Sequence, residues 1–210
     1  MKKRKKACSR MHFGAAAAFL AAFFAVMAVY KLPDAERSLF YPEKYSGYVE
    51  RYSQSNGLDK YFVYAIIKTE SGFDPAAESD VGARGLMQIM EDSFDWVKYR
   101  MEVSDDTEYS DMYDPEKNIE YGTYLLRLLF EEYGDEKTVA AAYHTGRGNV
   151  NKWLSDSRYS TDGKKLRDVP SAATGHYVDK VMKAYENYIS LYSASVEKGG
   201  ISFHFDIKKE

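Results

Sequence analysis

The sequence lacks the residue patterns of several large enzyme classes. None of HExxH, CxxC, GxGxxG, GxxxxGK[ST] or GxSxG occurs in its 210 residues. A single cysteine, Cys8, excludes an intrachain disulfide. The histidines are scattered at His12, His144, His176 and His204, and none of them pair at metal-ligand spacing. We therefore predict no metal, no cofactor and no Ser/His/Asp machinery, which leaves acid–base chemistry by a carboxylate.

Outside the first 30 positions, basic residues are outnumbered by acidic ones. Residues 1–30 hold six of the 29 Lys and Arg and no acid, so residues 31–210 carry 23 basic against 32 acidic residues, a net charge of −9. Nucleic-acid binding rests on neutralising phosphates with Lys and Arg, so the acidic body argues against such a partner. Tyrosine is in surplus, with 19 residues, which suits either a groove for a polar polymer such as a glycan or helices that pack with Tyr instead of Phe.

The N-terminus has the pattern of a membrane-targeting segment. A basic segment, residues 1–12, precedes residues 13–30, FGAAAAFLAAFFAVMAVY, which contain no charge. As a helix, this run just reaches across a hydrocarbon layer of about 30 Å, with the lysines on the cytoplasmic side. A single-pass signal-anchor is favoured over cleavage after Ala28, and either outcome places the rest of the chain outside the cytoplasm. Residues 31–42, bounded by Pro33 and Pro42, are predicted to be a linker.

The body, residues 43–193, is predicted to be a single, mostly α domain. Apolar residues recur at helical spacing in six stretches, bounded by residues suited to capping. The expected helices are about 45–56, 59–70, 93–97, 114–134, 138–143 and 173–193, with one or two further turns at 149–154. The acidic segment 102–112 is expected to be a surface loop, and the tail 194–210 contains ISFHFDI, a possible short strand.

One carboxylate, Glu70, stands at the end of an apolar helical run. Phe62, Ala65, Ile66 and Thr69 recur at i, i+3, i+4 and i+7, which is one face of a helix. A glutamate at that end is held by a buried helix and faces the loop that follows. An apolar face beside it raises the pKa of a carboxyl by desolvation, as a general acid requires.

Several ordered blocks resemble the catalytic domain of soluble lytic transglycosylases, a family with the goose-type lysozyme fold. The blocks are residues 70–75 (ESGFDP), 82–90 (GARGLMQIM), 114–119 (DPEKNI) with Gly122, 141–143 (AAY) and 177–178 (YV). The resemblance covers about residues 43–190. It implies an enzyme that cuts the β-1,4 bond between N-acetylmuramic acid and N-acetylglucosamine in peptidoglycan and leaves a 1,6-anhydromuramoyl end.

The resemblance also implies residue roles. Glu70 would act as acid and then as base, with the N-acetyl group of the substrate stabilising the positive charge. The expected substrate-binding residues are Ser71, Met87, Gln88, Tyr143, His144 and Tyr177. Tyr143 would orient Glu70, and Gln88 would bond either the sugar N-acetyl group or the surroundings of Glu70. Met87 would line the cleft, and Tyr177 would sit across the site. Ser71 could equally end its helix, and Met87 and Tyr177 could equally serve in the core.

This chain departs from the family pattern at three positions. His144 replaces the usual Asn, Glu91 the usual Pro, and Ala173 the usual Glu. Two alternatives therefore stay open. One is a muramidase in which Asp74 or Asp80 positions a water, and the other is a non-catalytic wall-binding or scaffold protein. A wall-spanning assembly is a further partner that the membrane-anchored arrangement would suit.

Overall fold

The computed structural model describes residues 38–102 and 106–193. The chain separates into two compact units, Met1–Pro42 and Glu43–Glu210. The predicted basic segment 1–12, the membrane segment 13–30, most of the linker and the tail 194–210 lie outside the described residues. No helix among the described residues is both long enough and apolar enough to cross a membrane.

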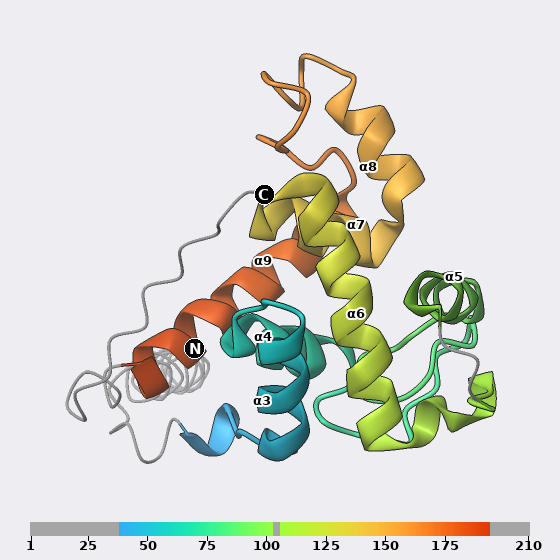
Figure 1. The fold of residues 1–210 in the computed structure, drawn as a ribbon. Helices are drawn as coiled ribbons and strands as arrows, with labels where there is room; N and C mark the ends of the chain where they lie inside the picture. Colours follow the sequence, from blue (N-terminus) through green and yellow to red (C-terminus); the bar gives the residue numbers. More distant parts are fainter. Residues whose placement is uncertain (1–37, 103–105, 194–210) are drawn as a thin grey trace, which may run out of the picture. The chain divides into compact units, whose positions relative to one another are not determined.

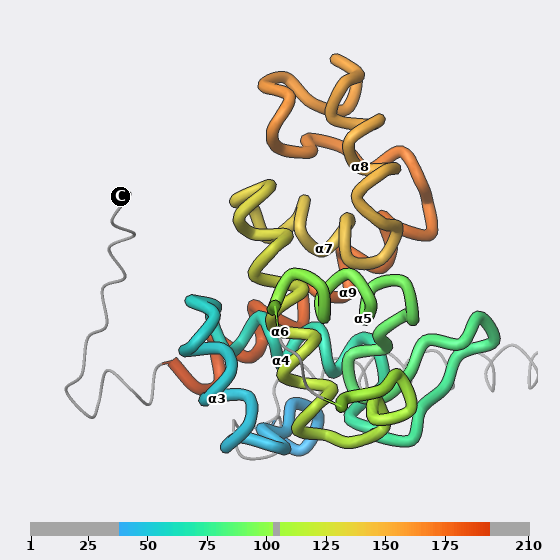
Figure 2. The backbone as a smooth tube through the Cα atoms, turned by 45° about the vertical axis from the view of Figure 1, so that its right-hand side comes forward, coloured from blue at the N-terminus to red at the C-terminus, as the bar shows by residue number. Residues whose placement is uncertain are grey.

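The second unit is mostly helical, as predicted. Its elements are α3 (Ser46–Ser55), α4 (Lys60–Glu70), α5 (Glu91–Met101), the 3₁₀-helix η1 (Tyr109–Tyr113), α6 (Pro115–Tyr133), α7 (Glu136–Thr145), α8 (Arg147–Leu154), α9 (Ala172–Tyr188) and the π-helix η2 (Ile189–Ser193). Figure 1 shows α6 running through the middle of this unit, with α8 at one end and α3 at the other. The tube in Figure 2 shows the same separation from a second direction.

Aspartate side chains begin several of these helices. Asp59 accepts a hydrogen bond from the backbone N–H of Tyr61, and Asp114 accepts one from that of Lys117. Each bond satisfies a donor that has no partner inside the helix. These two predicted starts are confirmed, as is the end of α6 at Gly134, which adopts φ 62.

Three predicted boundaries were wrong. Asp135 caps α7, so this helix begins at Glu136 and not at Thr138. The loop expected at residues 144–148 is reduced to Gly146, whose φ of 83 turns the chain straight into α8. The segment 102–112 is not all surface loop, because η1 places Met112 at 0% exposure. A single apolar side chain is too short a signal for sequence periodicity to detect.

Helix α4 forms the centre of the core. Its residues from Tyr61 to Ile67 are all buried, so the predicted single apolar face was too narrow. A helix that is hydrophobic all round is buried on every side. Phe62 packs edge-on against Phe130 of α6 and Tyr185 of α9, with ring centroids 5.3 Å and 5.5 Å apart. Glu70 is thus the last residue of the most enclosed helix in the unit.

Candidate active site

Glu70 is a half-buried carboxylate at the C-terminal end of α4. Its Oε1 accepts a hydrogen bond of 2.6 Å from the hydroxyl of Tyr177, which α9 carries. Burial raises the pKa of Glu70 to about 7, and the hydrogen bond from Tyr177 opposes this rise without cancelling it. Protonated and ionised forms are therefore both populated near neutral pH, which suits a group that must give and take a proton.

His144 covers the ring of Tyr177. The two rings are stacked with centroids 4.5 Å apart and an interplanar angle of 29°. His144 lies in the last turn of α7 and is exposed, whereas Tyr177 is buried. Partial desolvation lowers the pKa of His144 below its usual value, which favours the neutral imidazole. The structure thus brings Glu70, Tyr177 and His144 together from three helices, α4, α9 and α7.

Tyr143 does not make the contact that was predicted for it. Its hydroxyl donates a 2.7 Å hydrogen bond to the backbone carbonyl of Met87. The hydrogen bond to Glu70 comes from Tyr177 instead. Burial raises the pKa of the Tyr143 hydroxyl well above its usual value, with a further rise from the charge of Glu70, so the phenol stays neutral beside the site.

Ser71 joins the end of α4 to the following loop. Its hydroxyl donates to the carbonyl of Leu86 at 2.7 Å and accepts the backbone N–H of Phe73 at 3.1 Å. Ser71 is also the C-terminal capping residue of α4. Of the two roles left open by the sequence, ending the helix is the one that these contacts support.

Met87 packs in the core and the amide of Gln88 bonds its own loop, whereas the resemblance implied that both contact the substrate. Met87 is 0% exposed, so it packs in the core and does not line a cleft. A Cβ atom on Gly122 would approach the Met87 sulfur to 2.3 Å, which explains the glycine in α6. Gln88 has an unusual φ of 48, and its Nε2 donates to the carbonyls of Ala77 and Gly85, both at 3.0 Å. The Oε1 of this amide is left to accept a further hydrogen bond.

Asn118, which had no predicted role, holds the same loop from α6. It is 0% exposed, and its Oδ1 accepts the N–H of Met87 at 2.7 Å. Its Nδ2 donates to the carbonyls of Arg84 and Met112, at 2.9 Å and 2.8 Å. The only signal in the sequence was an amide beside the apolar stripe of α6, since a buried polar group needs partners.

The glycine at position 85 allows this approach of loop and helix. Gly85 has φ +73, and a Cβ there would lie 2.0 Å from the carbonyl oxygen of Met112 and 2.4 Å from Nδ2 of Asn118. A larger residue would displace the loop that Asn118 binds. In the part of the chain that the structure describes, no group of three His, Cys, Asp or Glu side chains gathers as metal ligands.

The described unit is thus a mostly α domain with a half-buried glutamate at the end of its central helix. A family model described as the transglycosylase SLT domain matches residues 47–166. The chain belongs to this family, as the sequence blocks predicted.

Known relatives agree with this membership. The soluble lytic murein transglycosylase of Salmonella typhimurium is 31% identical over 150 residues, covering 70% of this chain and 23% of the relative. The membrane-bound lytic murein transglycosylase C of Sodalis glossinidius is 31% identical over 169 residues, covering 69% of this chain and 46% of the relative. The chain therefore spans about a quarter of the soluble relative and about half of the membrane-bound one.

Solved structures show the same fold. The lytic transglycosylase Slt of Pseudomonas aeruginosa, an inactive mutant, superposes with a TM-score of 0.66 at 26% identity, covering 75% of this chain and 26% of that one. The 70 kDa soluble lytic transglycosylase of Escherichia coli gives a TM-score of 0.64 at 27% identity, covering 71% of this chain and 25% of that one. The lysozyme-like fold prediction is confirmed.

Proposed function

We propose that this protein is a peptidoglycan lytic transglycosylase. It cleaves the β-1,4 bond between N-acetylmuramic acid and N-acetylglucosamine and leaves a 1,6-anhydromuramoyl end. The observation that carries the proposal is Glu70, a half-buried carboxyl with a pKa of about 7 that Tyr177 holds by a hydrogen bond. The relatives named as murein transglycosylases support the substrate class.

The chemistry needs one group that changes from acid to base. Protonated Glu70 donates its proton to the glycosidic oxygen as the bond from that oxygen to the anomeric carbon breaks. The N-acetyl oxygen of the substrate stabilises the positive charge at the anomeric carbon. Ionised Glu70 then accepts the proton of the C6 hydroxyl, and the C6 oxygen bonds to the anomeric carbon to close the anhydro ring. A pKa near the working pH serves both steps.

The remaining predicted site residues divide into three groups. Ser71, Met87 and Tyr143 act through contacts within the protein, and they fix the loop that faces Glu70. Gln88 offers its Oε1 to the N–H of the sugar N-acetyl group, and the exposed imidazole of His144 offers a surface to a bound sugar. Tyr177 is a positioning residue, since its hydroxyl bonds Glu70 itself.

The mass of the product tests this proposal. Purified sacculi digested with the full chain are expected to release muropeptides with anhydromuramic ends, which are lighter by one water than hydrolysed ends. Reducing ends would show a muramidase instead, and binding without release would show a non-catalytic wall-binding protein. Asp74 is a weak candidate for positioning water, because it is exposed and its Oδ1 accepts the N–H of Ala76.

Tyr177→Phe is expected to move the pH profile of cleavage. In the wild type, activity should fall as the pH rises through about 7, because Glu70 loses the proton that it donates. The hydrogen bond from Tyr177 lowers the pKa of Glu70, so its loss moves the falling limb to higher pH. Initial rates on sacculi between pH 5 and 9, a range of about two units around that pKa, measure the shift. An unmoved limb would remove Tyr177 from this role.

We further propose that residues 13–30 anchor the domain to the membrane, with the domain outside the cytoplasm. The uncharged run and the basic residues before it support this. The relative named as membrane-bound is consistent with such an arrangement. Recovery of the full-length chain in the membrane fraction would support an anchor, and an N-terminus at Val29 would show cleavage instead. Membership of a wall-spanning assembly stays a prediction.

A further inference from the structure

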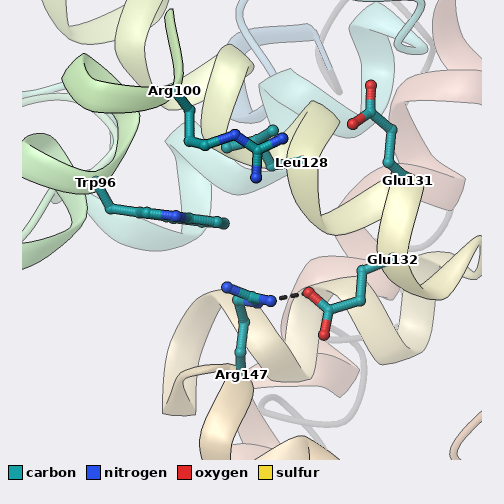
Figure 3. Close-up of a pocket in the computed structure, with 6 residues that line it drawn as sticks. All are labelled: Trp96, Arg100, Leu128, Glu131, Glu132 and Arg147. Carbon is teal, nitrogen blue, oxygen red and sulfur yellow. Dashed lines mark hydrogen bonds and ion pairs between the residues drawn. The ribbon is translucent and has the colours of Figure 1, made fainter.

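A pocket outside the Glu70 site lies where α5, α6 and the start of α8 meet. It encloses about 290 Å³. It is lined by Trp96, Arg100, Leu128, Glu131, Glu132 and Arg147. Figure 3 shows the indole of Trp96 between the side chains of Arg100 and Arg147, with the two glutamates on the α6 side. The pocket thus combines one aromatic surface, one apolar residue and four charged groups.

Most of the charge in this pocket is already compensated. Arg147 pairs with Glu132, and its guanidinium lies 4.7 Å from the ring centroid of Trp96. Glu131 pairs with Arg127 at 2.8 Å, one turn earlier on α6. Among the residues that the structure describes, Arg100 has no carboxylate partner. The pocket therefore presents one unpaired guanidinium in a body whose net charge is −9.

The end of α7 and the start of α8 link this pocket to the Glu70 site along the chain. Arg147 follows His144 by three residues, and three residues span at most about 11 Å. The ring of His144 stacks on Tyr177, whose hydroxyl bonds Glu70. Because peptidoglycan is a polymer, parts of it beyond the cleaved bond can reach a pocket whose Arg147 follows His144 by three residues.

We propose that this pocket binds the peptide stem of peptidoglycan, with a stem carboxylate on Arg100. This inference rests on the proposed function. The sugars of the glycan strand carry no charge once the stem is attached, whereas the stem carries free carboxylates. A guanidinium forms its strongest hydrogen bonds with a carboxylate, through two parallel N–H donors. Trp96 and Leu128 offer an apolar surface to the aliphatic part of the stem, and Arg147 already covers one face of the indole.

Arg100→Gln tests the proposal by a comparison of two substrates. The full chain is given glycan strands with intact stems and strands from which an amidase has removed the stems. We expect the ratio of kcat/KM on stemmed to stripped strands to fall about tenfold in the variant, since one charge-assisted hydrogen bond is worth about that much. Arg51→Gln is the matched control, because Arg51 is an exposed arginine on α3, away from the pocket, and it should leave the ratio unaltered.

Two outcomes would overturn the proposal. One is an equal loss on both substrates, which would mean that Arg100 acts on the fold or on the sugars. The other is an unchanged ratio. A third substrate is a strand whose stem carboxylates are amidated. On it the wild type should show the reduced kcat/KM that Arg100→Gln shows on strands with intact stems. Cleavage of stripped strands by the wild type tests the proposed function separately, so the two can fail independently.

Discussion

Glu70→Gln is expected to lower the rate of glycan cleavage by roughly 10²–10⁴-fold, the contribution of a positioned acid–base group. Glutamine keeps the size of the side chain and an oxygen that can accept the hydrogen bond from Tyr177, but it has no proton to give and no charge with which to take one. The rate of release of soluble muropeptides measures the loss. Wild-type rates in Glu70→Gln would place the acid elsewhere.

The stability of Glu70→Gln provides a control for its folding. The pKa of Glu70 is raised from 4.5 to about 7 in the folded chain, so the folded state binds more protons than the unfolded state between these values. Wild-type stability should therefore fall as the pH rises from about 4.5 to about 7. Glutamine does not titrate, so Glu70→Gln should be more stable than the wild type at pH 8. We expect a difference of about 1–2 kcal/mol, a value reduced for solvent screening because the side chain is partly exposed. Near pH 4 the advantage should vanish. Urea unfolding at both pH values measures it.

Local sequence signals predicted the ends of the helices that surround the site. A capping aspartate at 114 followed by Pro115, and a glycine at 134, act within one helical turn, so the sequence alone places the ends of α6. The position of Glu70 at the end of α4 follows in the same way. Its raised pKa could be expected from an apolar helix, although burial on every side of α4 was not apparent from one face.

Contacts between distant residues could not be predicted in this way. Tyr143 and Tyr177 carry the same hydroxyl, and only the packing of α7 and α9 decides which one reaches Glu70 and which one reaches Met87. Each tyrosine hydroxyl can donate one hydrogen bond, and the geometry of the fold, not the residue type, decides which acceptor it reaches. The pocket around Arg100 was missed for the same reason, since α5, α6 and α8 bring its residues together from positions 96 to 147.

Asn118→Ala is expected to destabilise the fold by about 2–4 kcal/mol. The change leaves two buried backbone groups without partners, the N–H of Met87 and the carbonyl of Met112, whereas the carbonyl of Arg84 keeps the N–H of Ile89. Each unsatisfied buried group costs about 1–3 kcal/mol, and relaxation or entering water recovers part of the sum. The free energy of unfolding in urea measures the effect. Asn149→Ala is the matched control, since that exposed amide bonds the carbonyl and hydroxyl of Thr145, four residues earlier, and should change stability by less than about 0.5 kcal/mol.

The effect of Asn118→Ala on activity should exceed its effect on the amount of folded protein. Asn118 fixes the N–H of Met87, and Tyr143 fixes the carbonyl of the same residue, so α6 and α7 hold the peptide units on both sides of Met87. Gln88 follows directly, with a strained φ of 48 that the surrounding bonds must maintain. With one side released, Gln88 is free to leave that conformation. Cleavage per folded molecule should then fall while the pKa of Glu70, read from the pH profile, stays near 7, because Tyr177 and α4 remain in place. A shifted profile would instead mean that the loop itself sets the environment of Glu70.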